Sequence, residues 1–233
     1  MRLPALLALA LLATLRACVA YEYEHEFWLR TDGSGTVFVT GRPSLWTAFK
    51  GLGSDQDPEG AATRDAARAL FERSGLRVRR VTLTRREGRP YLFVAADFAD
   101  VNRLAGTPAF PDLRLRLRRE NDRLRLEGEW RRPEPAPDLG MRDRDGLMAV
   151  RFHLPSRVYE HRNAAGVERG NIVAWRQDVA RGRDGQPLLI GALMDSRSIL
   201  GSTVALFAAA IGLALALLAV ALWLTVRRGV RRP

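Results

Sequence analysis

The sequence contains one cysteine, Cys18, and only three histidines in 233 residues. A single cysteine cannot form an intramolecular disulfide, and so few thiol and imidazole groups cannot supply the ligand set of a structural zinc site. We therefore expect no metal centre and no cofactor. A nucleophile with an aligned base is also missing from the sequence pattern, so we predict that the protein is not an enzyme.

Lysine is almost absent as well, since Lys50 is the only one and nearly all basic residues are arginine. The formal net charge is +11, but arginines without any compensating acid lie in the first twenty residues and in the last seven. Residues 21–197 keep a nearly balanced charge, which is typical of a solvated surface. Nucleic acid is therefore not an expected partner, because its phosphates require clustered basic residues.

Residues 1–20 are predicted to be a signal peptide. Arg2 precedes an apolar run that is too short to cross a bilayer, and small residues follow before the charged segment. Two cleavage modes stay open. The segment Leu15–Cys18 resembles a lipobox, which would make Cys18 the lipidation site of a lipoprotein, whereas cleavage after Ala20 would leave no lipid. The absence of Asn-x-Ser/Thr sequons favours a bacterial envelope.

A second apolar stretch covers residues 198–226 and contains no charged side chain. A membrane-spanning helix needs about 20 apolar residues, so we predict a transmembrane helix here. The basic tail 227–233 should remain in the cytoplasm by the positive-inside rule. We therefore expect a single-pass protein of the cytoplasmic (inner) membrane, with residues 21–197 as a periplasmic or otherwise extracytoplasmic domain. A small-residue row in the helix predicts a weak homodimer through Ala208, Gly212 and Ala216.

The exported domain is predicted to be α+β: a mostly antiparallel curved sheet with two or three helices on one face. Residues 21–30 alternate between apolar and charged side chains and form a hairpin with residues 36–40. Helices are expected in three early segments: 43–51, 59–74 and 97–105. Further strands are expected at 76–86, 90–96, 113–118, 124–130, 147–154, 171–179 and 188–194.

Two features of this predicted domain bear on its function. The hairpin around residues 113–130 has a leucine face and an arginine face, and residues 131–145 form an exposed loop because they are rich in proline and charge. A curved sheet over helices can also enclose an apolar cavity. The sequence therefore predicts a fold that is able to hold a hydrophobic ligand.

The segment Arg151–Trp175 contains a strand that reaches Pro155, an Asn/Gly turn and a strand that carries Trp175. This order resembles the end of the exported domain in LppM-type envelope proteins, a poorly characterised family. An export signal with a cysteine, an opening hairpin and one late membrane helix are similar too. The resemblance implies an association with envelope lipids. The residues alone leave a second interpretation open, in which Trp175 fills the core and Asn163, Gly166 and Gly170 only make a turn.

The densest polar segment supplies the candidate ligand-binding residues, which are Arg157, Tyr159, His161 and Asn163. They would contact lipid headgroups or another protein, with a solvated loop as the alternative. Three functions stay open: binding of a lipid or other apolar ligand, an assembly or interaction subunit of a membrane protein complex, and an enzyme with an unrecognised site. A pocket that combines a carboxylate with a histidine would support the enzyme, and the candidates are His25, His153 and His161.

Overall fold

The computed structural model describes residues 21–53, 60–133 and 145–229. The signal peptide with Cys18, residues 134–144 of the predicted loop and the last four residues of the basic tail lie outside the described residues. Eleven strands occur in the described ranges: β1 (Tyr23–Leu29), β2 (Gly35–Gly41), β3 (Arg77–Arg86), β4 (Arg89–Phe98), β5 (Leu113–Glu120), β6 (Arg123–Trp130), β7 (Leu147–His153), β8 (Val158–Arg162), β9 (Gly166–Glu168), β10 (Ile172–Asp178) and β11 (Leu188–Asp195).

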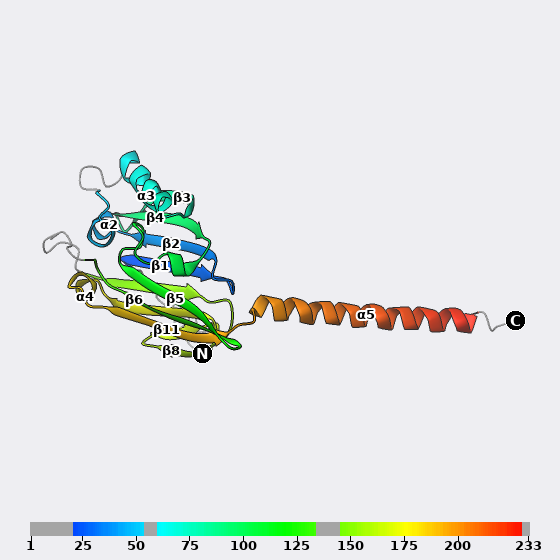
Figure 1. The fold of residues 1–233 in the computed structure, drawn as a ribbon. Coiled ribbons are helices and arrows are strands. Elements are labelled where there is room, and N and C mark those ends of the chain that lie inside the picture. Colours follow the sequence, from blue (N-terminus) through cyan, green and yellow to red (C-terminus); the bar gives the residue numbers. More distant parts are fainter. Residues whose placement is uncertain (1–20, 54–59, 134–144, 230–233) are drawn as a thin grey trace, which may run out of the picture.

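These strands form two sheets (Figure 1). The larger has the order β3-β4-β2-β1-β7-β10-β9 and the smaller the order β5-β6-β11-β8. The pairs are antiparallel except for β1 and β7, which run parallel. The helical segments are α2 (Pro43–Lys50), α3 (Ala61–Arg73), α4 (Val179–Arg183), α5 (Ile199–Gly229) and a 3-10 turn, η1 (Val101–Arg103). The predicted α+β class is confirmed, with the strands divided between two sheets.

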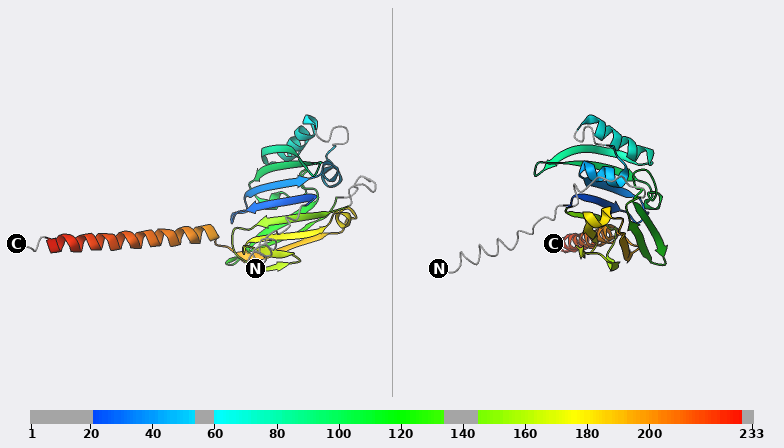
Figure 2. Two further views of the ribbon diagram at one scale, coloured as in Figure 1. Left: turned by 180° about the vertical axis from the view of Figure 1, so that it is seen from behind. Right: turned by 90° about the vertical axis from the view of Figure 1, so that its left-hand side faces the viewer.

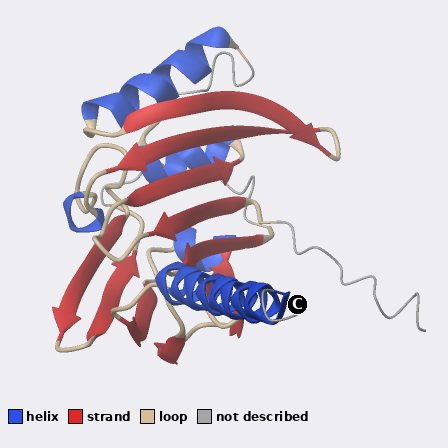
Figure 3. Cartoon of the chain, turned by 90° about the vertical axis from the view of Figure 1, so that its right-hand side faces the viewer, coloured by secondary structure: helices blue, strands red, loops and turns tan. Residues whose placement is uncertain are grey.

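Both α2 and α3 pack on the inner side of the larger sheet, which faces the smaller one. Trp46 and Phe49 of α2 place their rings 6.3 Å and 4.8 Å from that of Tyr23 in β1, and Phe49 also meets Trp130 of β6. Figure 3, viewed nearly along α5, shows the curved larger sheet with α3 along its β3 edge. Aromatic contacts thus hold α2 between the two sheets, whereas α3 packs on β3 and β4.

The space between the sheets is filled by large side chains rather than left as a cavity. The fully buried aromatic residues there are Tyr23, Phe27, Trp46, Phe49, Phe71, Phe110, Trp130, Phe152 and Trp175. The leucine face of the β5–β6 hairpin also points inward, as the alternating pattern predicted, and its arginines point outward. Close packing of this kind provides most of the hydrophobic stabilisation of a domain.

Three local predictions need correction. The helix predicted for residues 97–105 is only the η1 turn, because β4 continues to Phe98 and Asp97 is held across the sheet by Thr36. The segment 157–163 contains the edge strand β8 instead of a loop, since its backbone pairs with β11. The strand predicted to end at Val179 stops one residue earlier, and α4 follows it.

The helix α5 projects away from the domain, as the left view of Figure 2 shows. Its segment Thr203–Trp223 is long and apolar enough to cross a membrane, and none of it is buried against the rest of the protein. This agrees with the prediction of a membrane-associated protein. Ala208, Gly212 and Ala216 lie on its exposed surface, and dimerisation through them stays a prediction.

Candidate functional site

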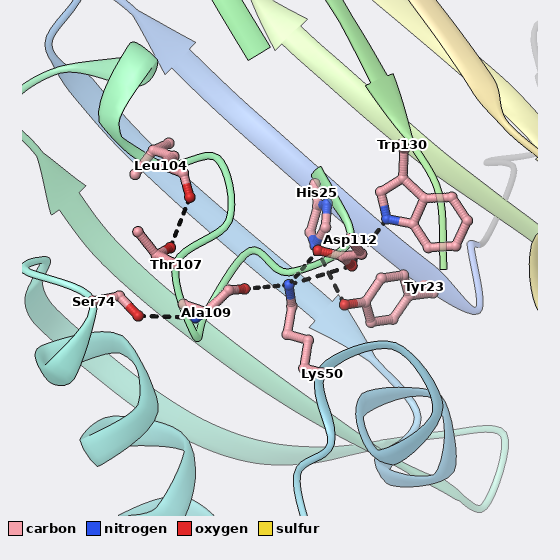
Figure 4. Close-up of polar contacts among 9 residues, drawn as sticks. All are labelled: Tyr23, His25, Lys50, Ser74, Leu104, Thr107, Ala109, Asp112 and Trp130. Carbon is pink, nitrogen blue, oxygen red and sulfur yellow. Dashed lines mark hydrogen bonds and ion pairs between the residues drawn. The ribbon is translucent and has the colours of Figure 1, made fainter. Parts of the chain in front are cut away.

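The interior of the domain contains a group of polar side chains, which we call the Lys50 cluster: Tyr23, His25, Lys50, Asp112 and Trp130 (Figure 4). The Lys50 ammonium lies 3.2 Å from Asp112 Oδ1 and also donates to the carbonyl of Ala109. Trp130 Nε1 donates to Asp112 Oδ2 at 3.0 Å. The cluster therefore ties α2 and the loop before β5 to β6 in the smaller sheet.

The histidine of this cluster, His25, belongs to β1. His25 has no exposed surface, and burial together with the nearby Lys50 charge lowers its pKa well below the ordinary value. Its Nε2 lies 3.3 Å from the Tyr23 phenol oxygen, and its Nδ1 has no hydrogen-bond partner in the described part of the chain. Neither Lys50 nor Asp112 exposes its side chain. Removal of one partner from such a buried pair is strongly destabilising, because it leaves an unpaired buried charge.

A second group of side chains surrounds an open groove at the end of β1, on the outer face of the larger sheet. The groove has a volume of about 470 Å³, and we call it the Trp28 groove after its most exposed aromatic side chain. It is lined by Trp28, Leu29, Arg30, Thr36, Phe38, Arg79, His153, Leu154 and Asn171. Trp28 is 50% exposed. A half-exposed indole beside apolar side chains is typical of a site that binds an apolar group.

The position of Trp28 is fixed by its neighbours on β1 and β7. Trp28 lies opposite His153 in the strand register, and their rings stack at 4.0 Å with an interplanar angle of 12°. His153 Nε2 lies 2.6 Å from Glu26 Oε1. Because an ionised carboxylate only accepts, the Nε2–H group of His153 donates. This hydrogen bond lowers the pKa of Glu26, against the opposing effect of burial. Glu26 thus orients His153, which in turn supports Trp28.

The opposite wall of the groove is cationic. Arg79 Nε donates to Asp97 Oδ2 at 2.8 Å, and Thr36 Oγ1 donates to Asp97 Oδ1 at 2.9 Å. These contacts hold the guanidinium of Arg79 beside the groove, with Arg30 also among the lining residues. The groove therefore combines an apolar floor with arginine side chains, a combination that suits a ligand with an apolar part and an anionic part.

The Trp28 groove lies at the end of the domain from which α5 leaves. Since β1 and β7 run parallel, they end on the same side of the sheet. Just beyond β7, the hydroxyl of Ser156 donates to the carbonyl of Asp195, the last residue of β11. The helix α5 begins at Ile199, and Figure 1 shows β1 pointing toward it. A membrane that contains α5 would therefore lie on the same side as the groove.

The four ligand-binding residues predicted from the sequence do not gather in one pocket. Tyr159 lines a pocket beside the start of α5, whereas His161 lines a separate groove along β8 and β11. Arg157 is exposed just before β8. Asn163 has a φ of 58°, which is typical of a turn. Tyr159 and His161 lie two residues apart on one face of β8, yet they line different pockets, and Arg157 and Asn163 flank the strand.

The second interpretation of the segment Arg151–Trp175 placed Trp175 in the core and three residues in turns. The geometry fits it for Asn163 and Gly170 but not for Gly166. Trp175 is fully buried, and its Nε1 donates to the carbonyl of Arg162 at 2.6 Å. Gly170 has a positive φ of 79°, but Gly166 begins β9. The sequence reasoning missed Trp28, although a signal existed: it is the one aromatic residue on the glutamate face of β1.

No family model and no curated protein matches this chain. Among solved structures, the NMR structure of the folded domain of Mycobacterium tuberculosis LppM matches with a TM-score of 0.40 and 16% sequence identity. The match covers 76% of this chain and 91% of that domain. This is a distant structural likeness, and no residue role or ligand follows from it.

Proposed function

We propose that the protein is a non-enzymatic, single-pass envelope protein that binds a lipid or another amphipathic ligand in the Trp28 groove. In this proposal α5 crosses the cytoplasmic membrane, the domain lies outside and the basic tail lies in the cytoplasm. The observation that carries the proposal is the half-exposed indole of Trp28 in a groove on the side of α5. An amphipathic molecule from the adjacent leaflet would reach this groove without crossing water.

The chemistry of the groove favours a ligand with two parts. Phe38, Leu154 and the face of Trp28 offer apolar contacts, and each CH₂ group moved there from water gains about 0.8 kcal/mol. Arg30 and Arg79 offer guanidinium groups, which bind phosphate or carboxylate. We therefore expect a lipid whose acyl chain lies on the indole and whose anionic group lies near the arginines.

The ligand proposal is tested by photo-crosslinking of the full-length protein in bacterial membranes. A phospholipid with a photoactivatable acyl chain should label peptides of the Trp28 groove in addition to α5. Trp28→Ala should reduce the groove label about tenfold, since a loss of ~1.4 kcal/mol of apolar contact has that effect. Val167→Ala removes apolar atoms from another exposed side chain, outside the groove, and serves as the control. Equal labelling of wild type and Trp28→Ala would refute the proposal.

The topology is tested separately. Protease added to spheroplasts should degrade residues 21–197, and a phosphatase fused after Pro233 should be inactive. An active phosphatase would place the C-terminus outside and overturn the orientation. Lipidation of Cys18 is tested in the same cells, because Cys18→Ser should abolish incorporation of a fatty-acid probe if the lipobox is used.

An assembly or interaction subunit is the second candidate, and one observation favours it. The space between the sheets is filled by aromatic side chains, so binding must use an open surface. Open apolar surfaces also seat side chains of protein partners. In the crosslinking experiment this candidate predicts a protein adduct at Trp28 and no lipid adduct in the groove.

An enzyme is the least supported of the three functions. The hydrogen bond between His153 and Glu26 provides the histidine and carboxylate that general-base catalysis would need. However, the only hydroxyl among the residues lining the groove belongs to Thr36, which donates to Asp97 rather than to the histidine. Binding without chemistry is therefore the simpler function for these residues.

A further inference from the structure

The connection between the domain and α5 is short. The strand β11 ends at Asp195, the helix begins at Ile199, and the segment that can span a membrane begins at Thr203. Four residues of extended chain reach at most about 14 Å, and four helical residues add about 6 Å. The headgroup layer is itself about 5 to 8 Å thick on each side of a bilayer. If α5 spans the membrane as proposed above, Asp195 lies close to the lipid headgroups.

The side chains at this junction form a pocket of mixed charge, which we call the juxtamembrane pocket. It has a volume of about 260 Å³ and is lined by Asp122, Arg123, Tyr159, Asp195 and Arg197. Asp122 lies in the β5–β6 turn and Arg123 begins β6, Tyr159 belongs to β8, and Asp195 ends β11 two residues before Arg197. Three separate segments therefore bring their side chains together beside the first turn of α5.

The contacts within the pocket keep its aromatic ring in a fixed orientation. Tyr159 is 50% exposed, and its hydroxyl donates to Asp195 Oδ2 at 3.3 Å. The Arg123 guanidinium lies 5.2 Å from the ring centroid. The backbone N–H of Arg197 donates to Asp195 Oδ1 at 2.9 Å. An amphipathic ring with adjacent arginines is the combination that proteins place at membrane interfaces.

We propose that the juxtamembrane pocket binds the headgroup of phosphatidylethanolamine and thereby docks the domain on the membrane surface. The two arginines match the phosphate, and the two aspartates match the ammonium group, so the balanced charge of the pocket fits a zwitterion better than a purely anionic headgroup. Phosphoethanolamine has about eight non-hydrogen atoms, which fit a pocket of this volume even at the ~30 Å³ that a molecule of liquid water occupies.

The proposal predicts a direct contact between the lipid amine and a carboxylate. A carbodiimide joins an amine to a carboxylate without a spacer, and coupling is fastest where the two groups are already in contact, so phosphatidylethanolamine should couple preferentially to Asp122 or Asp195. The full-length protein in nanodiscs is suited to this experiment, because the side chain of Lys50, the only lysine, has no exposed surface to compete. Mass spectrometry of peptides then locates the adduct.

Variants and lipid composition separate a specific pocket from surface chemistry. Arg123→Gln and Arg197→Gln should each lower the adduct about fivefold, given the usual contribution of one arginine near a membrane surface. Arg89→Gln removes an exposed arginine at the start of β4, which does not line the pocket, and should have no effect on the adduct. Replacing the phosphatidylcholine of the nanodisc by phosphatidylglycerol should not lower the yield of the phosphatidylethanolamine adduct. Equal coupling to the distant Glu87, or a yield that does not depend on the two arginines, would overturn the proposal.

The two proposals fail in different ways. Trp28→Ala should leave the carbodiimide adduct unchanged, because the Trp28 groove and the juxtamembrane pocket share no lining residue. Alkaline extraction of membranes tests the span independently. A protein that is retained but gives no adduct refutes the docking alone, whereas a protein that is extracted refutes the membrane span on which the docking rests.

Discussion

His25 and Glu26 are neighbours in β1, yet they take part in two very different sites. The side chain of His25 points into the core, where it is fully buried beside the Lys50–Asp112 pair, and burial lowers its pKa. The side chain of Glu26 points outward and accepts a hydrogen bond from the partly exposed His153. The strand alternation alone separates them. Similar residue types can therefore stabilise a fold on one face of a strand and position a groove on the other.

The largest expected difference between these sites concerns stability. Asp112→Ala removes the carboxylate that pairs with the buried Lys50 ammonium and accepts from the Trp130 N–H, and it leaves Lys50 only the carbonyl of Ala109. We expect it to lower the free energy of unfolding by about 3–5 kcal/mol. Urea denaturation of the full-length protein in detergent, followed by tryptophan fluorescence, measures this. A loss below about 1 kcal/mol would mean that the cluster is solvated and does not hold the sheets together.

A double replacement sharpens this contrast. Lys50→Met combined with Asp112→Leu removes both buried charges and restores apolar volume. The double variant should be more stable than Asp112→Ala by about 2 kcal/mol or more, because no unpaired charge remains. The same denaturation experiment tests it. If both variants are equally unstable, the hydrogen bond from Trp130, rather than the charge pair, dominates the cluster.

A substitution in the Trp28 groove should reduce ligand binding more than it reduces the free energy of unfolding. Trp28→Ala should change the free energy of unfolding by only about 1 kcal/mol, because half of the indole is already in water. Trp46→Ala is the matched comparison, since it truncates a fully buried tryptophan and should cost about 3–5 kcal/mol. A large loss of stability for Trp28→Ala would show that this side chain is a core residue and not a binding residue.

The smallest expected effect is a pH dependence. The hydrogen bond from His153 keeps the pKa of Glu26 below its ordinary value of 4.5. Its contribution to stability is therefore present above that value and is lost as the pH falls through the lower folded-state pKa. Glu26→Gln should flatten the decline of stability between about pH 5 and 3 by less than about 1 kcal/mol. Glu87→Gln, in an exposed turn, controls for net charge; an identical flattening there would remove any special role of Glu26.

The sequence predicted those parts of the protein that depend on short stretches of chain. The β1–β2 hairpin, the helices at 43–50 and 61–73, the two-faced hairpin of β5 and β6 and the apolar α5 all follow from periodicity, turn residues and length. Even the exposed Trp28 is visible as an apolar residue on a charged strand face. Local patterns state which face a residue occupies, so they were sufficient for the class of the fold.

Only the tertiary structure decided which residues meet. The parallel pairing of β1 with β7 joins segments more than a hundred residues apart and brings His153 to Glu26 and Trp28. The contact between Lys50 and Asp112 likewise depends on how α2 packs between the sheets. Side-chain alternation determines the face of each strand but not its partner or its register. The packing of the whole core sets the partner and the register of each strand. It thereby also forms the Lys50 cluster and the Trp28 groove.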